Sequence, residues 1–189
     1  TGVNNTLIGG LAGDAITTAN DNVAVGKGSL TADTTGAENT AVGNVTLAFN
    51  TTGASNAAFG YGALYANTTA SNNTAIGYSS LAANTTGHEN SALGRNSLAA
   101  NTTGQHNTGT GDSVLASTTT GSSNTAVGSA ALYNNTTASN NTAVGYSVLL
   151  TNTTGSENTG LGHNALYGTT TGAGNTGIGQ GALQTNTTG

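Results

Sequence analysis

The chain has few charged residues. Only 5% of its residues are Asp, Glu, Lys or Arg, against about 25% in typical soluble domains. Its two cationic side chains are Lys27 and Arg95, and its net charge is −5. Because nucleic-acid binding depends on clustered Lys and Arg that neutralise phosphates, we expect no nucleic-acid partner.

Proline, cysteine, methionine and tryptophan are absent from the sequence. Without cysteine no disulfide bond forms, so noncovalent contacts must hold the fold together. No apolar run approaches the roughly 18 residues that a membrane-spanning helix needs, and we expect no membrane span.

One 17-residue unit, N-T-A-V-G-x-x-A/S-L-x-x-N-T-T-G-x-x, runs without insertion or deletion from Asn5 to Gly189. Positions are counted from its leading Asn, and the units begin at residues 5, 22, 39, 56, 73, 90, 107, 124, 141, 158 and 175. A fixed short period predicts a solenoid in which each unit is one coil. We expect a single repeat domain over residues 1–189. Because the chain starts and stops inside a unit, we expect it to be a segment of a longer fibrous protein.

The start of each unit predicts a short strand. In the unit that begins at Asn73, a T-A-I segment leads through Ile76 to Gly77, and Leu81 follows at position 9. β-Branched residues before an invariant glycine favour a strand that ends in a turn, and the glycine indicates either a positive φ or a close backbone approach. We predict an all-β parallel β-roll or β-helix of about eleven coils, with an asparagine ladder at position 1. Neither strand face carries charge, so we expect both to be buried.

The N-T-T-G segment closes each coil as a second short strand or as a turn. Its two threonines, such as Thr85 and Thr86, face opposite sides if the segment is extended.

Each unit supplies only two sizeable apolar side chains, at positions 4 and 9. Their burial contributes about 3–6 kcal/mol per coil, whereas ordering the backbone costs about 1–2 kcal/mol for every residue. We therefore expect a homotrimer with one apolar column near its axis, and a monomeric two-sheet solenoid is the alternative.

The segments 73–77, 124–128 and 141–145, of the form N-T-A-V/I-G, resemble the strand motif of trimeric autotransporter adhesin heads. The resemblance extends over Asn5 to Gly189 and implies a left-handed parallel β-roll, a homotrimer and attachment at a bacterial surface. The full unit also looks like repeats of phage tail-fibre-like proteins. An extracellular location, on a bacterial cell surface or a virion, follows from either resemblance.

Neither an active site nor a cofactor or metal site is expected. The histidines His88, His106 and His163 fall at positions 16, 17 and 6. Residues at one position stack in one column of the solenoid, so these three lie in different columns, and we expect no histidine pair to form a ladder site. Four acidic residues share position 17, where a solvated edge is expected. They are Asp21, Glu38, Glu89 and Glu157.

All six tyrosines fall in two columns. Position 6 holds Tyr61, Tyr78 and Tyr146, and position 10 holds Tyr65, Tyr133 and Tyr167. Both columns are otherwise variable, which indicates exposure. We expect these tyrosines either to contact a ligand or a partner, or to pack along the coil edge.

These features lead us to expect a structural and adhesive rod of an extracellular fibre that binds a host-surface protein or glycan. A spacer or filament subunit without a ligand is the alternative. An ice-binding solenoid is a third reading, weakened because the Thr85–Thr86 pair leaves one outward threonine per coil.

Overall fold

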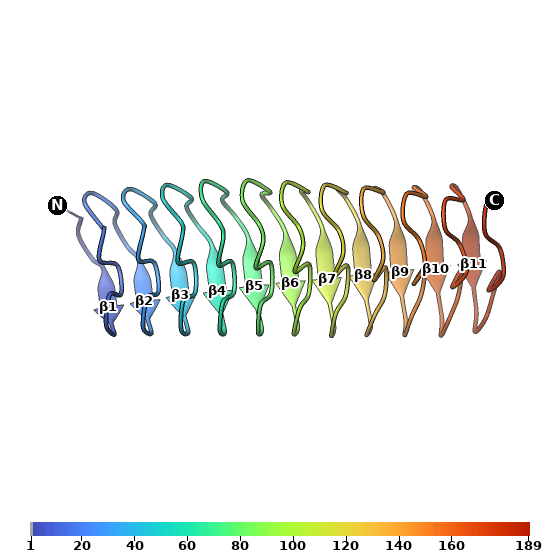
Figure 1. Ribbon diagram of the computed structural model, residues 1–189, viewed down its shortest axis with the longest axis horizontal. Coiled ribbons are helices and arrows are strands. Elements are labelled where there is room, and N and C mark those ends of the chain that lie inside the picture. Colours follow the sequence, from blue (N-terminus) through green and yellow to red (C-terminus); the bar gives the residue numbers. More distant parts are fainter. Residues whose placement is uncertain (1) are drawn as a thin grey trace.

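A computed structural model describes residues 2–189, so Thr1 of the expected domain lies outside the described range. The described chain forms eleven three-residue strands in one sheet. They are β1 (Thr6–Ile8), β2 (Val23–Val25), β3 (Thr40–Val42), β4 (Ala57–Phe59), β5 (Thr74–Ile76), β6 (Ser91–Leu93), β7 (Thr108–Thr110), β8 (Thr125–Val127), β9 (Thr142–Val144), β10 (Thr159–Leu161) and β11 (Thr176–Ile178). The coils stack into a rod with the chain termini at its two ends (Figure 1).

The sheet is parallel, and its strand order follows the sequence from β1 to β11. Each strand pairs one repeat further along, so that Thr74 lies beside Ser91 and Ile76 beside Leu93. The predicted all-β parallel solenoid is therefore confirmed. Residues 2–189 contain no helix that is long and apolar enough to span a membrane.

The glycine at position 5 ends each strand in the conformation that the sequence predicts. Gly77 has a φ of 131°, which L side chains rarely adopt. A Cβ placed on Gly77 would also lie 2.5 Å from the carbonyl oxygen of Gly94 in the next coil. The glycine column is needed both for the turn and for the close approach of neighbouring coils.

The core lies on one side of the sheet. Ala75 in β5 and Leu81 at position 9 are fully buried, as are their counterparts in most coils. Leu81 has a φ of 51°, a left-handed conformation that costs about 1–3 kcal/mol in a residue other than glycine. Complete burial of the leucine side chain offsets this cost by about 1.5–3 kcal/mol.

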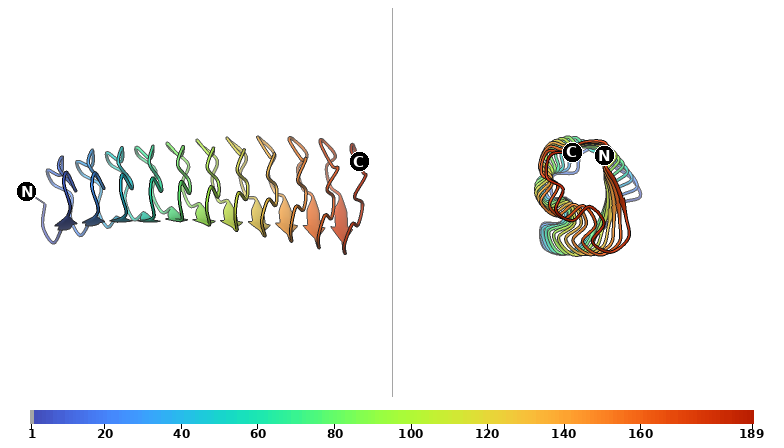
Figure 2. Two further views of the ribbon diagram at one scale, coloured as in Figure 1. Left: turned by 60° about the horizontal axis from the view of Figure 1, so that its bottom comes forward. Right: turned by 90° about the vertical axis from the view of Figure 1, so that its right-hand side faces the viewer.

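The other side of the sheet is open, and the expectation that both strand faces are buried is wrong for the single chain. Ile76 is 42% exposed and Phe59 is 39% exposed, and both are at position 4. The remainder of each coil folds back over positions 1 and 3 only, so none of residues 2–189 covers positions 2 and 4. The view along the rod in Figure 2 shows the coils stacked over one another with a gradual twist.

Asparagine side chains join the coils on the buried side. The backbone N–H of Asn73 donates to Oδ1 of Asn56 at 3.0 Å, and Nδ2 of Asn73 donates to the Gly87 carbonyl at 3.0 Å. The ladder predicted at position 1 thus bonds mainly to backbone, with a weaker amide contact from Asn73 Nδ2 to Asn56 Oδ1 at 3.3 Å. A second buried ladder, which the sequence analysis missed, lies at position 12, where Asn84 Nδ2 donates to Asn67 Oδ1 at 3.0 Å.

The N-T-T-G segment forms a turn, which settles the choice left open by the sequence. Both the backbone N–H and the hydroxyl of Thr85 donate to the Thr102 carbonyl, at 2.9 and 3.0 Å. Thr85 is half-buried and Thr86 is exposed. Position 13 therefore ties coils together, and position 14 faces solvent.

Candidate functional site

Each coil contributes to two ridges on the rod surface, one at position 6 and one at position 10, with recessed residues between them. After the glycine turn, the position-6 side chain projects outward, and Tyr78 is 55% exposed. Ser79 at position 7 has a φ of 51°, and this turn leads the chain inward to the buried residues Ser80 and Leu81. The chain emerges again at position 10, where Tyr65 is 39% exposed in the preceding coil.

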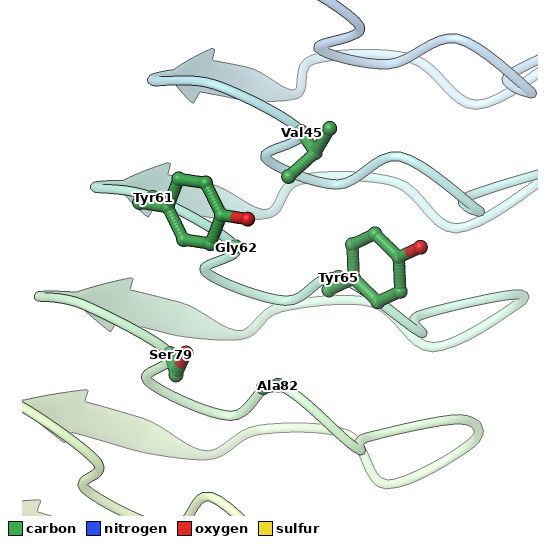
Figure 3. A pocket seen from close by; sticks show the side chains of 6 residues that line it. All are labelled: Val45, Tyr61, Gly62, Tyr65, Ser79 and Ala82. Atoms are coloured by element: carbon green, nitrogen blue, oxygen red, sulfur yellow. The ribbon is translucent and has the colours of Figure 1, made fainter.

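These ridges border a groove along the rod. A pocket of about 280 Å³ is lined by Val45, Tyr61, Gly62, Tyr65, Ser79 and Ala82, which occupy positions 6, 7 and 10 of three consecutive coils. In Figure 3 the Tyr61 and Tyr65 rings stand apart on one coil, with Gly62 between them. Two further pockets fall on the same line, one between Leu11 and Tyr65 and the other between His163 and Gln184. We call this feature the axial groove.

Four aromatic rings gather in the N-terminal half of the axial groove. The rings of Tyr61 and Tyr78 stack with centroids 5.3 Å apart and planes 9° from parallel. Tyr65 meets Phe49 edge to face, with centroids 4.9 Å apart. We call Phe49, Tyr61, Tyr65 and Tyr78 the N-terminal aromatic cluster. Sequence reasoning missed Phe49, although position 11 of one coil is a neighbour of position 10 in the next.

A second group of rings lies in the C-terminal half. Tyr146 and His163 stack with centroids 5.4 Å apart and planes 10° from parallel. Tyr133 and Tyr167 stand in the facing column, one coil before and one coil after Tyr146. These four residues are the C-terminal aromatic cluster. Five coils separate Tyr61 from Tyr146, or about 24 Å at the spacing of parallel strands.

The six tyrosines named by the sequence thus lie in two clusters along the columns that line these pockets, and Tyr61 and Tyr65 line a pocket themselves. Five are exposed, and Tyr167 is half-buried. Between the clusters, position 6 holds Arg95 and Asp112, which pair in two contacts, Nε to Oδ1 at 2.8 Å and Nη2 to Oδ2 at 3.0 Å. This pair neutralises its own charge, so the groove presents mostly aromatic faces and small polar groups.

Two of the histidines meet although they lie in different columns, a contact that the sequence did not predict. The rings of His88 and His106 have centroids 5.4 Å apart, and Glu89 contacts both. Columns 16 and 17 are adjacent, and side chains on neighbouring coils reach across the coil spacing. Residues at the same position do not show this contact, because it joins position 16 of one coil to position 17 of the next.

Known proteins give no guide to the site. None of the family models, curated proteins or solved structures compared with the chain matches it. The resemblance to adhesin heads and phage fibres therefore rests on the repeat motif. The structure agrees with the fold that this resemblance implies in one respect, which is the parallel solenoid of short coils.

Proposed function

We propose that the chain is the structural and adhesive rod of an extracellular fibre, and that its axial groove binds a glycan on a host surface. A bacterial surface adhesin or a phage-type tail fibre would use such a rod in the same way. The observation that carries the proposal is the stacked and exposed pair Tyr61 and Tyr78 beside the pocket at Tyr65.

Aromatic rings suit a carbohydrate ligand. The apolar faces of sugar rings pack on flat aromatic faces, and the phenolic hydroxyl at the ring edge donates and accepts hydrogen bonds. Ring stacking across coils places Tyr61 and Tyr78 side by side, which gives a surface two coils wide. The pockets are open and aligned, so a linear oligosaccharide fits this groove better than a compact ligand does.

Self-association is the second part of the proposal. Position 4 forms an outward column that includes Phe59, Ile76, Leu93 and Val127, each 38–42% exposed, and Thr110 interrupts it between Leu93 and Val127. Exposed apolar side chains gathered on one face, such as Phe59, Ile76 and Leu93 in consecutive strands, are typical of an interaction surface. We propose that three chains bury this column against one another in a homotrimer. The axial groove starts beyond the glycine turn at position 5, which leaves its ridges free to bind.

An oligosaccharide array tests the proposal when it is combined with sedimentation. The wild-type protein is expected to sediment as a trimer and to bind glycans, and the double variant Tyr61→Ala/Tyr65→Ala is expected to remain trimeric and to lose binding. Wild-type protein that binds no glycan on the array would instead support a spacer without a ligand.

The outward threonines of the sheet favour one further candidate, an ice-binding solenoid. Position 2 carries Thr108, Thr125, Thr142, Thr159 and Thr176 in five consecutive strands, β7 to β11. This array is separate from the threonines at positions 13 and 14. Ice binding needs the sheet face in solvent, whereas the trimer buries it. Thermal hysteresis of a monomer in solution would favour ice over the trimeric adhesin.

A further inference from the structure

A cluster of two histidines and a glutamate lies on the coil edge. His88 and Glu89 are at positions 16 and 17 of the coil that begins at Asn73, and His106 is at position 17 of the next coil. One ligand atom from each of these three residues lies within 4.8 Å of the other two. We propose that His88, Glu89 and His106 bind one divalent transition-metal ion, with Zn²⁺ as the reference metal.

The backbone places the three side chains together. Glu89 and His106, both at position 17, have left-handed φ values of 58° and 57°. The backbone therefore has the same conformation at this position in successive coils, and the two side chains project from equivalent points of the rod. The N–H of His106 donates to the carbonyl oxygen of His88 at 3.3 Å, which fixes the two histidines across the coil boundary.

The distances suit a shared ion. Nδ1 of His106 lies 3.0 Å from Oε2 of Glu89, and Nδ1 of His88 lies 3.6 Å from Oε1 of Glu89. Two donors on one tetrahedral zinc, each about 2.0–2.1 Å from the metal, are about 3.4 Å apart. The side chains of all three residues are 39–51% exposed, so they have room to adjust and to leave the fourth position to water.

The donor set selects the class of metal. Imidazole nitrogens favour Zn²⁺, Cu²⁺ and Ni²⁺, whereas Ca²⁺ and Mg²⁺ prefer sites made entirely of oxygen. The cluster also departs from its own repeat, since neighbouring coils carry Ala54, Ser71 or Ser122 at position 16 and Ser55 or Ser123 at position 17. The stacking of coils therefore does not require histidine at either place. The site is independent of the axial groove and of the proposed function.

Calorimetric titration with ZnCl₂ after chelator treatment tests the site. We expect one Zn²⁺ per chain, no measurable binding of CaCl₂, and weaker Zn²⁺ binding on acidification because imidazole ligands must be deprotonated. The variants His88→Ser and His106→Ser place at each position a residue that other coils already carry there, so the fold is retained. Each is expected to weaken Zn²⁺ binding about tenfold or more.

The third histidine provides the matched control. His163 lies in the C-terminal aromatic cluster, and His163→Gln introduces the residue found at position 6 of the next coil, Gln180. This variant is expected to bind Zn²⁺ like the wild type. Wild-type protein that does not bind Zn²⁺, or His88→Ser and His106→Ser variants that bind it with unchanged affinity, would overturn the proposal.

Discussion

Tyr61 and Tyr78 occupy the same position of consecutive coils, and their rings stack with centroids 5.3 Å apart and planes 9° from parallel. The solenoid sets this distance, because strands β4 and β5, which precede the two tyrosines, are neighbours in one parallel sheet. A repeat can thus build a continuous aromatic surface from single substitutions in successive units, while the buried positions of the same units remain constant.

Replacing Tyr61 by alanine is expected to weaken glycan binding by about tenfold or more, because a central aromatic contact often contributes at least about 2 kcal/mol to a binding free energy. Stability should change little, since stacking of an exposed ring pair contributes about 0.5–1.5 kcal/mol. Calorimetry with an oligosaccharide identified on the array measures the first effect, and thermal unfolding measures the second. Thr69→Ala, a change at an exposed residue outside the groove, is the control and should have no effect on binding.

Phe59 distinguishes the sheet face from the groove. It is an aromatic residue of similar exposure to Tyr65 but lies at position 4 in strand β4. Phe59→Ser should weaken the trimer and leave the glycan affinity of each chain unchanged, because the two surfaces lie on different sides of the glycine turn. Sedimentation at several protein concentrations measures the first effect. A trimer unaffected by Phe59→Ser and by Ile76→Ser would contradict the proposed interface.

Asp33 gives the rod a pH-dependent stability. It heads the position-12 ladder, where its Oδ1 accepts from Asn50 Nδ2 at 2.9 Å and its Oδ2 is buried without a partner. Burial raises the pKa of the Asp33 carboxyl from 3.8 to about 6, although hydrogen bonds from Gly36 and Asn50 oppose the rise. The folded state therefore holds a proton that the unfolded state releases between about pH 4 and 6, and stability falls as the pH rises through this window.

The variant Asp33→Asn should remove this pH dependence. At pH 7 it should also be more stable than the wild type, by up to about 3 kcal/mol for a shift of about two pH units. Urea unfolding of both proteins at pH 4 and pH 7 measures the difference. The exposed Asp21→Asn change is the control. Parallel pH profiles for wild type and Asp33→Asn would refute the assignment to Asp33.

Thr118 interrupts the position-12 ladder. Asn101 Oδ1 is buried without a hydrogen-bond partner, because Thr118 in the next coil cannot supply the side-chain amide that Asn84 receives from Asn101. Thr118→Asn should supply that donor and stabilise the protein by about 1 kcal/mol. The unfolding free energy checks this, and the exposed Thr120→Asn should leave it unchanged.

The glycine column is expected to tolerate no side chain. Gly77→Ala combines an unfavourable φ with a Cβ only 2.5 Å from the Gly94 carbonyl oxygen, and should cost about 2–4 kcal/mol. Gly10→Ala provides a control at a position with no neighbouring atom within 4 Å. Thermal unfolding of the two variants should show a loss of stability for Gly77→Ala only.

The sequence predicts the parts of this molecule that depend on one repeat considered alone. The strand before Gly77, its positive φ and the buried column through Leu81 follow directly from the unit. The open sheet face at Ile76 was missed, because the unit does not show on which side the rest of the coil folds. Contacts between different columns were missed for a related reason. Phe49 meeting Tyr65, and His88 meeting Glu89 and His106, depend on the distance between coils and on turn directions that a consensus does not carry.

Tyrosine fluorescence during a glycan titration tests the central claim most directly. The chain has no tryptophan and six tyrosines, and all six occupy the columns that border the axial groove. An oligosaccharide bound at the N-terminal aromatic cluster should change the tyrosine emission saturably, with the dissociation constant found by calorimetry, and Tyr61→Ala/Tyr65→Ala should abolish the change. Calorimetric binding with no change in tyrosine emission, or unchanged binding by the double variant, would contradict the account.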